Sequence, residues 1–420
     1  MYKINWKKEL SGTIKIGGSK NAVLPIIAAS LLIKWKVTLT NVPDIGDVYT
    51  FLDIIKWVGV NVKFENHILE LDSTELKESN FDLEKMKKIR VSILLLAPLL
   101  ERLWKISIPT PGGCNLGKRP IDDHIKWLEN IGYKSITNFE SIDLEWETSS
   151  GNMDVNGWFW VTVTENLLVA NVLRKWITTI KLAAIEPHVM NLIDFLRKAG
   201  AKISMRYNHT IIIEGVEELK WDFEFEVVSD YIQSGSYMVM WALCAKEFIE
   251  IQNARVEDLF FYIQKLKEIW VKIEILENDV VRVYRSNDLK ATNIQTNVFP
   301  GFPTDLQSPF VILMTQAKGI SKIHEVLFEW RLGWLVELEK MGLDMKISNP
   351  HEAEIIGWVK FKATTVTSWD LRAGCAVAIA GLIADWETTV TNNAYIKRWY
   401  EDFVLNLQKL GADIKEIEWE

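Results

Sequence analysis

The segment Lys198-Ala199-Gly200-Ala201 ends a predicted helix, and the same type of ending occurs six times along the 420-residue chain. The residue that follows a helix commonly adopts the left-handed conformation, in which a Cβ is costly and glycine is favoured. Five of the six endings have glycine there, and one has Trp270. The six endings are Trp57-Val58-Gly59-Val60, Asn130-Ile131-Gly132-Tyr133, Lys198-Ala199-Gly200-Ala201, Glu268-Ile269-Trp270-Val271, Lys340-Met341-Gly342-Leu343 and Lys409-Leu410-Gly411-Ala412. This recurrence predicts a fold built from repeated units.

Each unit also contains an earlier helix, which is followed after a short turn by a strand. The earlier helices end at Ile33-Lys34-Trp35, Arg102-Leu103-Trp104, Arg174-Lys175-Trp176, Cys244-Ala245-Lys246, Ala317-Lys318-Gly319 and Ala384-Asp385-Trp386. Tryptophan stands four times where we expect a left-handed turn that favours glycine. Six units divide as three plus three near residue 228, so the sequence predicts two similar α/β domains.

The composition supports a soluble two-domain enzyme. Apolar residues make up 48% and charged residues 25% of the chain, which excludes a disordered, collagenous or coiled-coil protein. The net charge of −8 argues against a nucleic-acid partner. Three cysteines and six histidines show neither C-x-x-C nor H-x-x-x-H spacing, so we expect no disulfide framework and no metal. No stretch predicts a signal peptide or membrane span, so we expect a cytoplasmic protein without a membrane partner.

The densest candidate motif is the Gly/Pro-rich segment 111–120. Gly112 to Lys118 match the G-x-x-x-x-G-K of a P-loop, but Arg119 stands where that motif needs Ser or Thr. We prefer a loop that displays Cys114 between cations, since Lys118 and Arg119 would lower the pKa of the thiol and make it reactive. The alternative is a buried structural cysteine, which is our prediction for the two cysteines in apolar helical runs.

Two further segments allow both a functional and a structural interpretation. Gly17-Gly18-Ser19-Lys20-Asn21 precedes a helix, so its backbone N–H groups and Lys20 could meet an anion; the alternative is a glycine turn with a solvated lysine. Asp305 follows Phe299-Pro300-Gly301-Phe302-Pro303-Thr304 at the start of a helix. It could be a base in a cleft of cations, or simply an N-cap.

Isolated arginines complete the candidate site. Arg90, Arg331, Arg372 and Arg398 each begin a helix or lie in a turn, and singly each would be an ordinary surface charge. Several cations at equivalent ends of the repeats predict a site between the domains for a substrate rich in phosphate and carboxylate.

Together these segments resemble the enolpyruvyl transferase family, and within it the UDP-N-acetylglucosamine 1-carboxyvinyltransferases. The resemblance covers essentially the whole chain and rests on residues 18–22, 111–114, 117–122, 299–305, 370–374 and Arg398. It implies two inverse α/β domains, each built from three βαβαββ-like units, with the active site in the cleft between them. We expect these domains to be residues 21–228, which carry the Cys114 loop, and residues 1–20 with 229–420.

The resemblance also implies a reaction. Phosphoenolpyruvate adds to the 3′-hydroxyl of UDP-N-acetylglucosamine and phosphate leaves, in the first committed step of peptidoglycan precursor synthesis. Both substrates are small molecules, and no cofactor is implied. An acid and a base are needed, because protonation of the vinyl carbon develops oxocarbenium character.

Residue roles follow from the same resemblance. Phosphoenolpyruvate would contact Lys20, Asn21, Arg119, Arg372 and Arg398. The UDP-sugar would lie along Arg90, Arg119, Pro120, Ile121, Asp122, Asp123, Asp305 and the backbone near Leu327. The catalytic set would be Cys114, Lys20 and Asp305, with Arg331 and Asp370 as further candidates. Cys114 would protonate the methylene carbon and react with epoxide antibiotics such as fosfomycin, while Asp305 would take the proton of the sugar hydroxyl.

Some positions depart from the family pattern, and two other functions stay open. Val228-Ser229-Asp230-Tyr231-Ile232-Gln233-Ser234-Gly235 replaces the usual Pro-Asp-Arg-Ile-Glu-Thr-Gly, Ile185 a usual Arg, and Trp330 a usual Asn. The sister enzyme that acts on shikimate 3-phosphate shares the fold but lacks the cysteine loop. A catalytically silent paralogue that binds a UDP-sugar as a regulatory module is the other alternative, and the retained candidate catalytic residues argue against it.

The chain has 19 tryptophans beside only 22 glycines, an unusual balance. The family pattern has glycine where this chain has Trp6, Trp35, Trp104, Trp127, Trp176, Trp270, Trp386 and Trp399. Our hypothesis is that UGA codons of the gene mean glycine and have been translated as tryptophan. The alternative is genuine tryptophan tolerated in turns. Under the hypothesis, the chain with tryptophan at these sites folds poorly.

Overall fold

The computed structural model describes residues 1–5, 9–77, 90–109, 122–137, 141–147, 151–220 and 222–418. The described residues form two compact units: residues 18–228, here called the internal unit, and residues 1–17 with 229–418, here called the terminal unit. The domain boundaries expected from the sequence, 21–228 and 1–20 with 229–420, stay a prediction, because compactness alone does not test independent folding.

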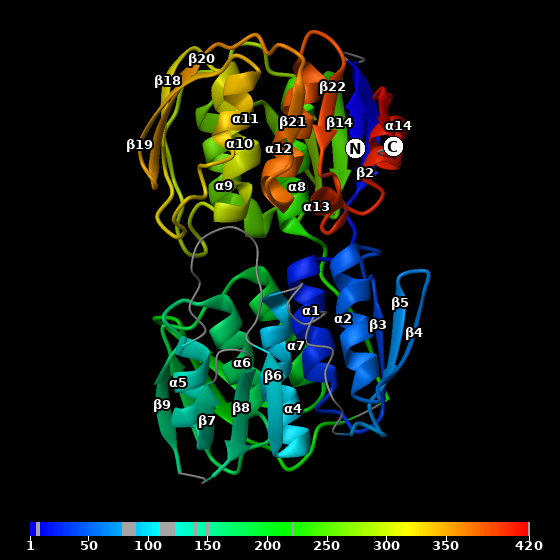
Figure 1. Ribbon diagram of the computed structural model, residues 1–420, viewed down its shortest axis with the longest axis vertical. Helices are drawn as coiled ribbons and strands as arrows, with labels where there is room; N and C mark the ends of the chain where they lie inside the picture. The colour runs from blue at the N-terminus through cyan, green and yellow to red at the C-terminus, as the bar shows by residue number, and fades with distance from the viewer. Residues whose placement is uncertain are drawn as a thin grey trace. The chain divides into compact units, whose positions relative to one another are not determined.

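The terminal unit contains three sheets of four strands each, and each sheet belongs to one repeat (Figure 1). The first repeat consists of β2 (Leu10–Lys15), α8 (Tyr231–Cys244), β14 (Ala245–Gln252), α9 (Phe260–Glu268), β15 (Ile273–Leu276) and β16 (Val280–Tyr284). Its strand order is β15-β16-β14-β2; β2 runs parallel to β14, and the other pairs are antiparallel. This is the β-α-β-α-β-β order that the family resemblance implies.

The other two repeats of the terminal unit follow the same plan. The second consists of β17 (Ile294–Gln295), α10 (Gln307–Gln316), β18 (Gly319–His324), α11 (Leu335–Lys340), β19 (Asp344–Asn349) and β20 (Glu352–Gly357). The third consists of β21 (Thr365–Thr367), α12 (Leu371–Ile383), β22 (Thr388–Thr391), α13 (Ala394–Lys397), α14 (Phe403–Lys409) and β23 (Ile414–Glu416). Strand β1 (Tyr2–Ile4) lies between β22 and β23, so the start of the chain completes the last sheet.

The internal unit repeats the pattern with two four-stranded sheets and one three-stranded sheet among its described residues. Its first repeat consists of α1 (Lys20–Ser30), β3 (Lys36–Thr40), α2 (Gly46–Trp57), β4 (Asn61–Glu65) and β5 (Ile68–Asp72), with β13 (Glu224–Glu226) parallel to β3. Its second consists of η1 (Arg90–Leu95), α4 (Leu96–Leu103), β6 (Lys105–Pro109), α5 (Asp122–Asn130), β7 (Tyr133–Thr137) and β8 (Ser141–Trp146). Its third consists of β9 (Met153–Asn156), α6 (Val161–Asn171), β10 (Ile177–Lys181), α7 (Pro187–Lys198), β11 (Lys202–Arg206) and β12 (Thr210–Glu214). The predicted α/β class and its repeated units are confirmed.

The first helices of the repeats form the core of the terminal unit. Helices α8, α10 and α12 contact one another and lie inside the surrounding sheets (Figure 1). Their sequences are apolar on all sides, and nearly all of their residues are buried. A helix without a polar face is stable only in such an enclosed position. In the internal unit α1 and α6 are buried in the same way.

The second-helix endings have the backbone that the repeat predicts. The glycines have φ of 87° at Gly59, 102° at Gly132, 98° at Gly200, 99° at Gly342 and 103° at Gly411. Trp270 at the equivalent position has φ 74°. The repeat therefore imposes the left-handed conformation on this position whether or not glycine occupies it.

The sequence predicts a left-handed backbone for the four tryptophans at the ends of the earlier helices. This prediction is wrong for three of them. Trp104 has φ 65°, whereas Trp35, Trp176 and Trp386 lie outside the left-handed region. Trp104 directly follows α4 and donates its N–H to the carbonyl of Leu100, as a left-handed cap requires. Helix α1 instead ends at Ser30, so position 35 lies beyond the cap.

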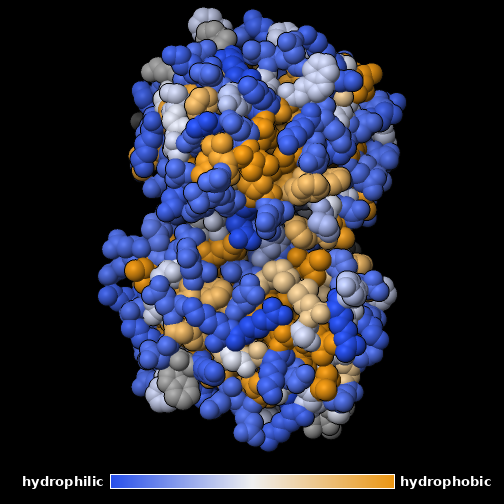
Figure 2. Space-filling view, turned by 180° about the vertical axis from the view of Figure 1, so that it is seen from behind, coloured by the Kyte–Doolittle hydropathy of each residue, from blue (hydrophilic) through white to orange (hydrophobic). Residues whose placement is uncertain are grey.

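Many of the tryptophans are exposed. The exposed fraction is 78% for Trp386, 64% for Trp330, 61% for Trp104 and 60% for Trp270. Other apolar side chains also reach the surface, and Figure 2 shows such areas in orange on the face that it presents. Within the described residues, no helix has the length and apolarity needed to cross a bilayer.

Candidate active site

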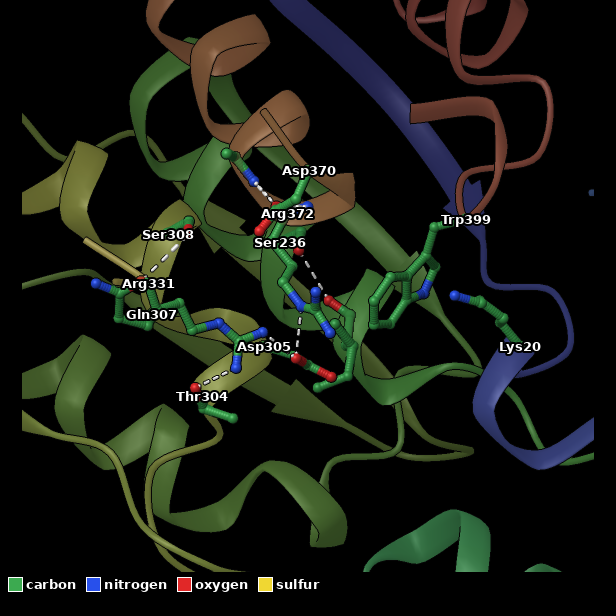
Figure 3. Close-up of polar contacts among 12 residues, drawn as sticks. Lys20, Ser236, Thr304, Asp305, Gln307, Ser308, Arg331, Asp370, Arg372 and Trp399 are labelled. Carbon is green, nitrogen blue, oxygen red and sulfur yellow. Dashed lines mark hydrogen bonds and ion pairs between the residues drawn. The ribbon is translucent and has the colours of Figure 1, made fainter. Parts of the chain in front are cut away.

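A carboxylate held by two arginines is the centre of the candidate site in the terminal unit. Asp305 lies in η3 (Thr304–Leu306), the short turn before α10. Its Oδ1 accepts hydrogen bonds from Arg331 Nη2 at 2.6 Å and from Arg372 Nε at 2.6 Å (Figure 3). The structure thus brings together three of the residues predicted from the sequence. The N-cap alternative for Asp305 is wrong, because the N-cap of α10 is Leu306.

The two guanidinium groups decide the charge of Asp305. Burial favours the neutral acid and raises the pKa, but Arg372 and Arg331 together outweigh it and hold the pKa of Asp305 well below its usual range. Asp305 is therefore ionised and able to accept a proton, but it is a weak base as long as both arginines contact it.

Arg331 is fixed on two sides. It is 1% exposed, and besides Asp305 its guanidinium donates to Thr304 Oγ1 through Nη1. Its carbon Cζ also lies 4.9 Å from the centre of the Phe328 ring. Trp330, directly before it, has φ 61°, a conformation in which asparagine is better tolerated than tryptophan.

Arg372 is placed by the start of α12. Asp370 is the N-cap of this helix, and its Oδ1 accepts from the N–H groups of Arg372 at 2.7 Å and Ala373 at 2.8 Å. This cap fixes the first turn of α12 and with it the direction of the Arg372 side chain. Asp370 thus contributes to the site indirectly, because it caps the helix that positions Arg372.

The segment that departs from the family pattern forms a second part of the site. Asp230 caps α8 and also accepts the indole N–H of Trp399 at 2.8 Å, while Gln233 donates to the Trp399 carbonyl at 3.0 Å. The guanidinium of Arg372 lies 5.3 Å from the centre of the Trp399 ring. The preceding Arg398 is half-buried, with its guanidinium 5.8 Å from the Tyr395 ring.

The internal unit holds Lys20 and Asn21 at the N-terminus of α1. Lys20 Nζ lies 2.8 Å from Asp47 Oδ2, with side chains 7% and 1% exposed. The alternative of a solvated lysine is therefore wrong. The sequence did not single out Asp47, because an acidic residue in the first turn of a helix is common in any protein.

Several predicted site residues cannot be placed. Cys114, Arg119, Pro120 and Ile121 lie outside the described residues, and their roles stay predictions. Arg90, Asp122 and Asp123 are described only by their backbone, at the starts of η1 and α5. The other two cysteines, Cys244 and Cys375, are buried as predicted, and burial raises the pKa of each thiol to about 12. In the described part of the chain, no three His, Cys, Asp or Glu side chains gather as metal ligands do.

Sequence reasoning missed a buried acid beside the arginines. Glu325 directly follows β18 and is fully buried. Its carboxylate accepts from Thr304 Oγ1 at 2.7 Å, from Thr296 Oγ1 at 2.9 Å and from the N–H of Leu327 at 3.0 Å. The Leu327 backbone, which the resemblance places along the UDP-sugar, thus donates a hydrogen bond to Glu325. No motif marks a lone glutamate at a strand end, so no sequence signal identifies it.

Comparison with known proteins shows the same relationship over the full length. A family model described as EPSP synthase (3-phosphoshikimate 1-carboxyvinyltransferase) matches residues 4–407. A UDP-N-acetylglucosamine 1-carboxyvinyltransferase of Halothermothrix orenii is 37% identical over 97% of this chain and 97% of its own. A protein of the same name from Finegoldia magna is 37% identical over the whole of both chains.

Solved structures agree in fold. The enolpyruvyl transferase NikO from Streptomyces tendae has a TM-score of 0.90 at 22% identity, covering 99% of this chain and 98% of its own. EPSP synthase from Acinetobacter baumannii has a TM-score of 0.71 at 16% identity, covering 99% of both chains. At these low identities the solved structures show only the fold, whereas the more similar relatives show the branch of the family. The chain therefore belongs to the enolpyruvyl transferase family, on the branch of the UDP-N-acetylglucosamine 1-carboxyvinyltransferases.

Proposed function

We propose that this protein transfers the enolpyruvyl group of phosphoenolpyruvate to the 3′-hydroxyl of UDP-N-acetylglucosamine and releases phosphate. The observation that carries the proposal is the 37% identity to proteins of this name over the full length. The reaction begins the synthesis of peptidoglycan precursors, and we place it in the cytoplasm.

The Asp305 cluster supports this chemistry. Proton addition to the methylene carbon leaves positive charge on the carbon that bears the phosphate, and the sugar oxygen attacks that carbon. Asp305 accepts the hydroxyl proton, and loss of phosphate and of one methyl proton restores the double bond. A substrate with phosphate and carboxylate groups also requires cations, which Arg331 and Arg372 supply.

The same cluster couples binding to proton transfer. Arg372 is the more exposed of the two cations that contact Asp305, at 15% against 1% for Arg331. An anion that draws Arg372 away removes one of the two charges that depress the pKa of Asp305. The carboxylate then becomes a stronger base only when the substrate is bound, which suits a base near neutral pH.

The remaining roles are proposals from the family pattern. Lys20 and Asn21 begin α1, where backbone N–H groups favour an anion such as phosphoenolpyruvate. The buried ion pair with Asp47 fixes the Lys20 side chain in place. Cys114 would supply the proton to the methylene carbon, and Arg119 and Arg398 would share in holding phosphoenolpyruvate.

Transfer to shikimate 3-phosphate is the second candidate, because the matching family model carries that enzyme's description. A phosphate-release assay separates the two with the purified chain, phosphoenolpyruvate and one acceptor at a time. We expect release with UDP-N-acetylglucosamine alone. Release only with shikimate 3-phosphate would favour the second candidate. Binding of the UDP-sugar without release of phosphate would favour a silent paralogue.

A further inference from the structure

We propose that Glu325 is a positioning residue of this site, which acts through Thr304 to hold the Arg331 guanidinium against Asp305. The idea rests on the proposed function, because it assigns a task within that reaction. Three features of the described residues carry it: the burial of Glu325, the single hydrogen of the Thr304 hydroxyl, and the charge balance around Asp305.

The first feature is the fixed orientation of the Glu325 carboxylate. The side chain is fully buried, and each of its oxygens accepts at least one hydrogen bond. Oε1 accepts from the N–H of Leu327, a donor that cannot reverse its role, so Oε2 must face Thr304. A buried carboxylate with these partners has one stable orientation.

The second feature is the direction of the Thr304 hydroxyl. A threonine hydroxyl has one hydrogen to donate and two lone pairs that accept. Thr304 Oγ1 donates to Glu325 Oε2 at 2.7 Å, so its lone pairs are left to accept from Arg331 Nη1. Glu325 thereby fixes the hydroxyl in the orientation that Arg331 requires. With one nitrogen on Thr304 and another on Asp305, the planar guanidinium cannot rotate (Figure 3).

The third feature is charge. Two guanidinium groups share one oxygen of Asp305, so this carboxylate alone does not balance them. Burial and the neighbouring Arg372 lower the pKa of Arg331, whereas Asp305, Glu325 and Asp370 raise it. Glu325 is thus one of the acids that make a second buried cation tolerable. It keeps Arg331 in place when Arg372 turns to the substrate.

The test uses purified full-length variants and measures kcat and KM for phosphoenolpyruvate together with thermal unfolding. Glu325→Gln places an amide nitrogen where Thr304 needs an acceptor, and Thr304→Val removes the hydroxyl. We expect each to lower kcat about tenfold or more, since a misplaced catalytic group is costly, while KM changes little. The double variant should fall no lower than either single variant, because both changes break the same link.

Two further variants give the comparison. Thr304→Ser keeps the hydroxyl and should retain clearly more activity than Thr304→Val. Glu354→Gln removes a carboxylate of β20 that pairs with Lys322 at 3.0 Å on the surface of the same sheet, and it should leave kcat and KM unchanged.

Several results would overturn the proposal. The first is a folded Glu325→Gln variant with the kcat of the unaltered chain. The second is a double variant in which the decreases in kcat of the two single variants multiply. The third is a loss of activity that a lower melting temperature explains entirely. If the unaltered chain releases no phosphate, the proposed function itself fails. The effects of the two single changes on unfolding then still test the link: additive effects would refute it, and non-additive effects would support it.

Discussion

Replacement of Trp270 by glycine separates the backbone demand of the repeat from the contribution of the indole ring. Trp270 has φ 74°, and its five counterparts are glycines between 87° and 103°. The ring is 60% exposed, and the Lys290 ammonium lies 5.7 Å from the ring centre. Such an exposed cation–π contact is worth about 0.5 kcal/mol.

The magnitude follows from a comparison of glycine with alanine. A residue with a Cβ in the left-handed conformation costs about 1–2 kcal/mol. The advantage of glycine over alanine is reduced by about 0.5 kcal/mol, because glycine has more conformational freedom to lose when the chain folds. Both Trp270→Gly and Trp270→Ala lose the ring, so we expect glycine to be the more stable variant by about 1 kcal/mol, or roughly 2–4 °C in melting temperature for a unit of this size.

The assay is thermal unfolding of the two variants beside the unaltered chain, with Trp241→Gly as the contrasting change. Trp241 is fully buried and stacks on Tyr237 at 5.3 Å, so its loss should cost about 3–5 kcal/mol. Trp270→Gly should instead be at least as stable as the unaltered chain. If Trp270→Ala proves as stable as Trp270→Gly, the left-handed strain is absent and the reasoning fails.

The same position tests the hypothesis about the genetic code. We expect UGA at codon 270 of the gene, and at codons 35, 176, 386 and 399. Glycine should then occupy these positions in peptides of the protein from its natural source, as mass spectrometry would show. UGG at all five codons would end the hypothesis and leave five genuine tryptophans, of which Trp270 has a left-handed backbone.

Other predictions concern the site and the charges. Asp305→Asn should lower kcat by about a hundredfold or more, since general acid–base groups contribute that much; a kcat near that of the unaltered chain would remove Asp305 as the base. Asp47→Asn removes the carboxylate that pairs with the buried Lys20 ammonium and should cost about 3–5 kcal/mol in urea unfolding, whereas a cost below about 1 kcal/mol would indicate a weak pair. Burial, and then the Glu186 charge, raise the pKa of Glu165 well above its usual value, so this group stabilises the fold at low pH and loses that contribution as pH rises. The melting temperature of Glu165→Gln relative to the unaltered chain should therefore increase from pH 5 to pH 8, and a constant difference would contradict the assignment. Fosfomycin should add to the chain at one cysteine, and Cys114→Ser should prevent it; an adduct on Cys114→Ser would place the reactive thiol elsewhere.

The sequence predicts the repeats well because they depend on local signals. A left-handed residue after a helix is a property of a few neighbouring residues, so the pattern identifies position 270 despite its tryptophan. The error at Trp35 has the same origin. The pattern treats similar residues as structurally equivalent, although α1 ends several residues earlier relative to its tryptophan than α4 does. Helix ends shift by a few residues with tertiary packing, which one sequence does not show.

The candidate site is less predictable because its contacts join distant parts of the chain. Asp305 meets Arg331 and Arg372, which are 26 and 67 residues away. The motifs indicated these residue types, but not that both guanidinium groups share one carboxylate oxygen. Glu325 is less visible still, since its role depends on a hydroxyl hydrogen that only the folded geometry directs.

The tryptophans bear on stability and on the site in different ways. Trp104 and Trp270 lie in exposed left-handed turns, so a change there alters the free energy of unfolding without touching the Asp305 cluster. Trp399 is buried, donates to Asp230 and lies beside the Arg372 guanidinium. A glycine at position 399 would remove the ring that lies beside the Arg372 guanidinium. It would leave space next to this arginine, which we propose binds the substrate. The reading of the gene therefore affects the fold at many positions, and at position 399 it also affects the surroundings of Arg372.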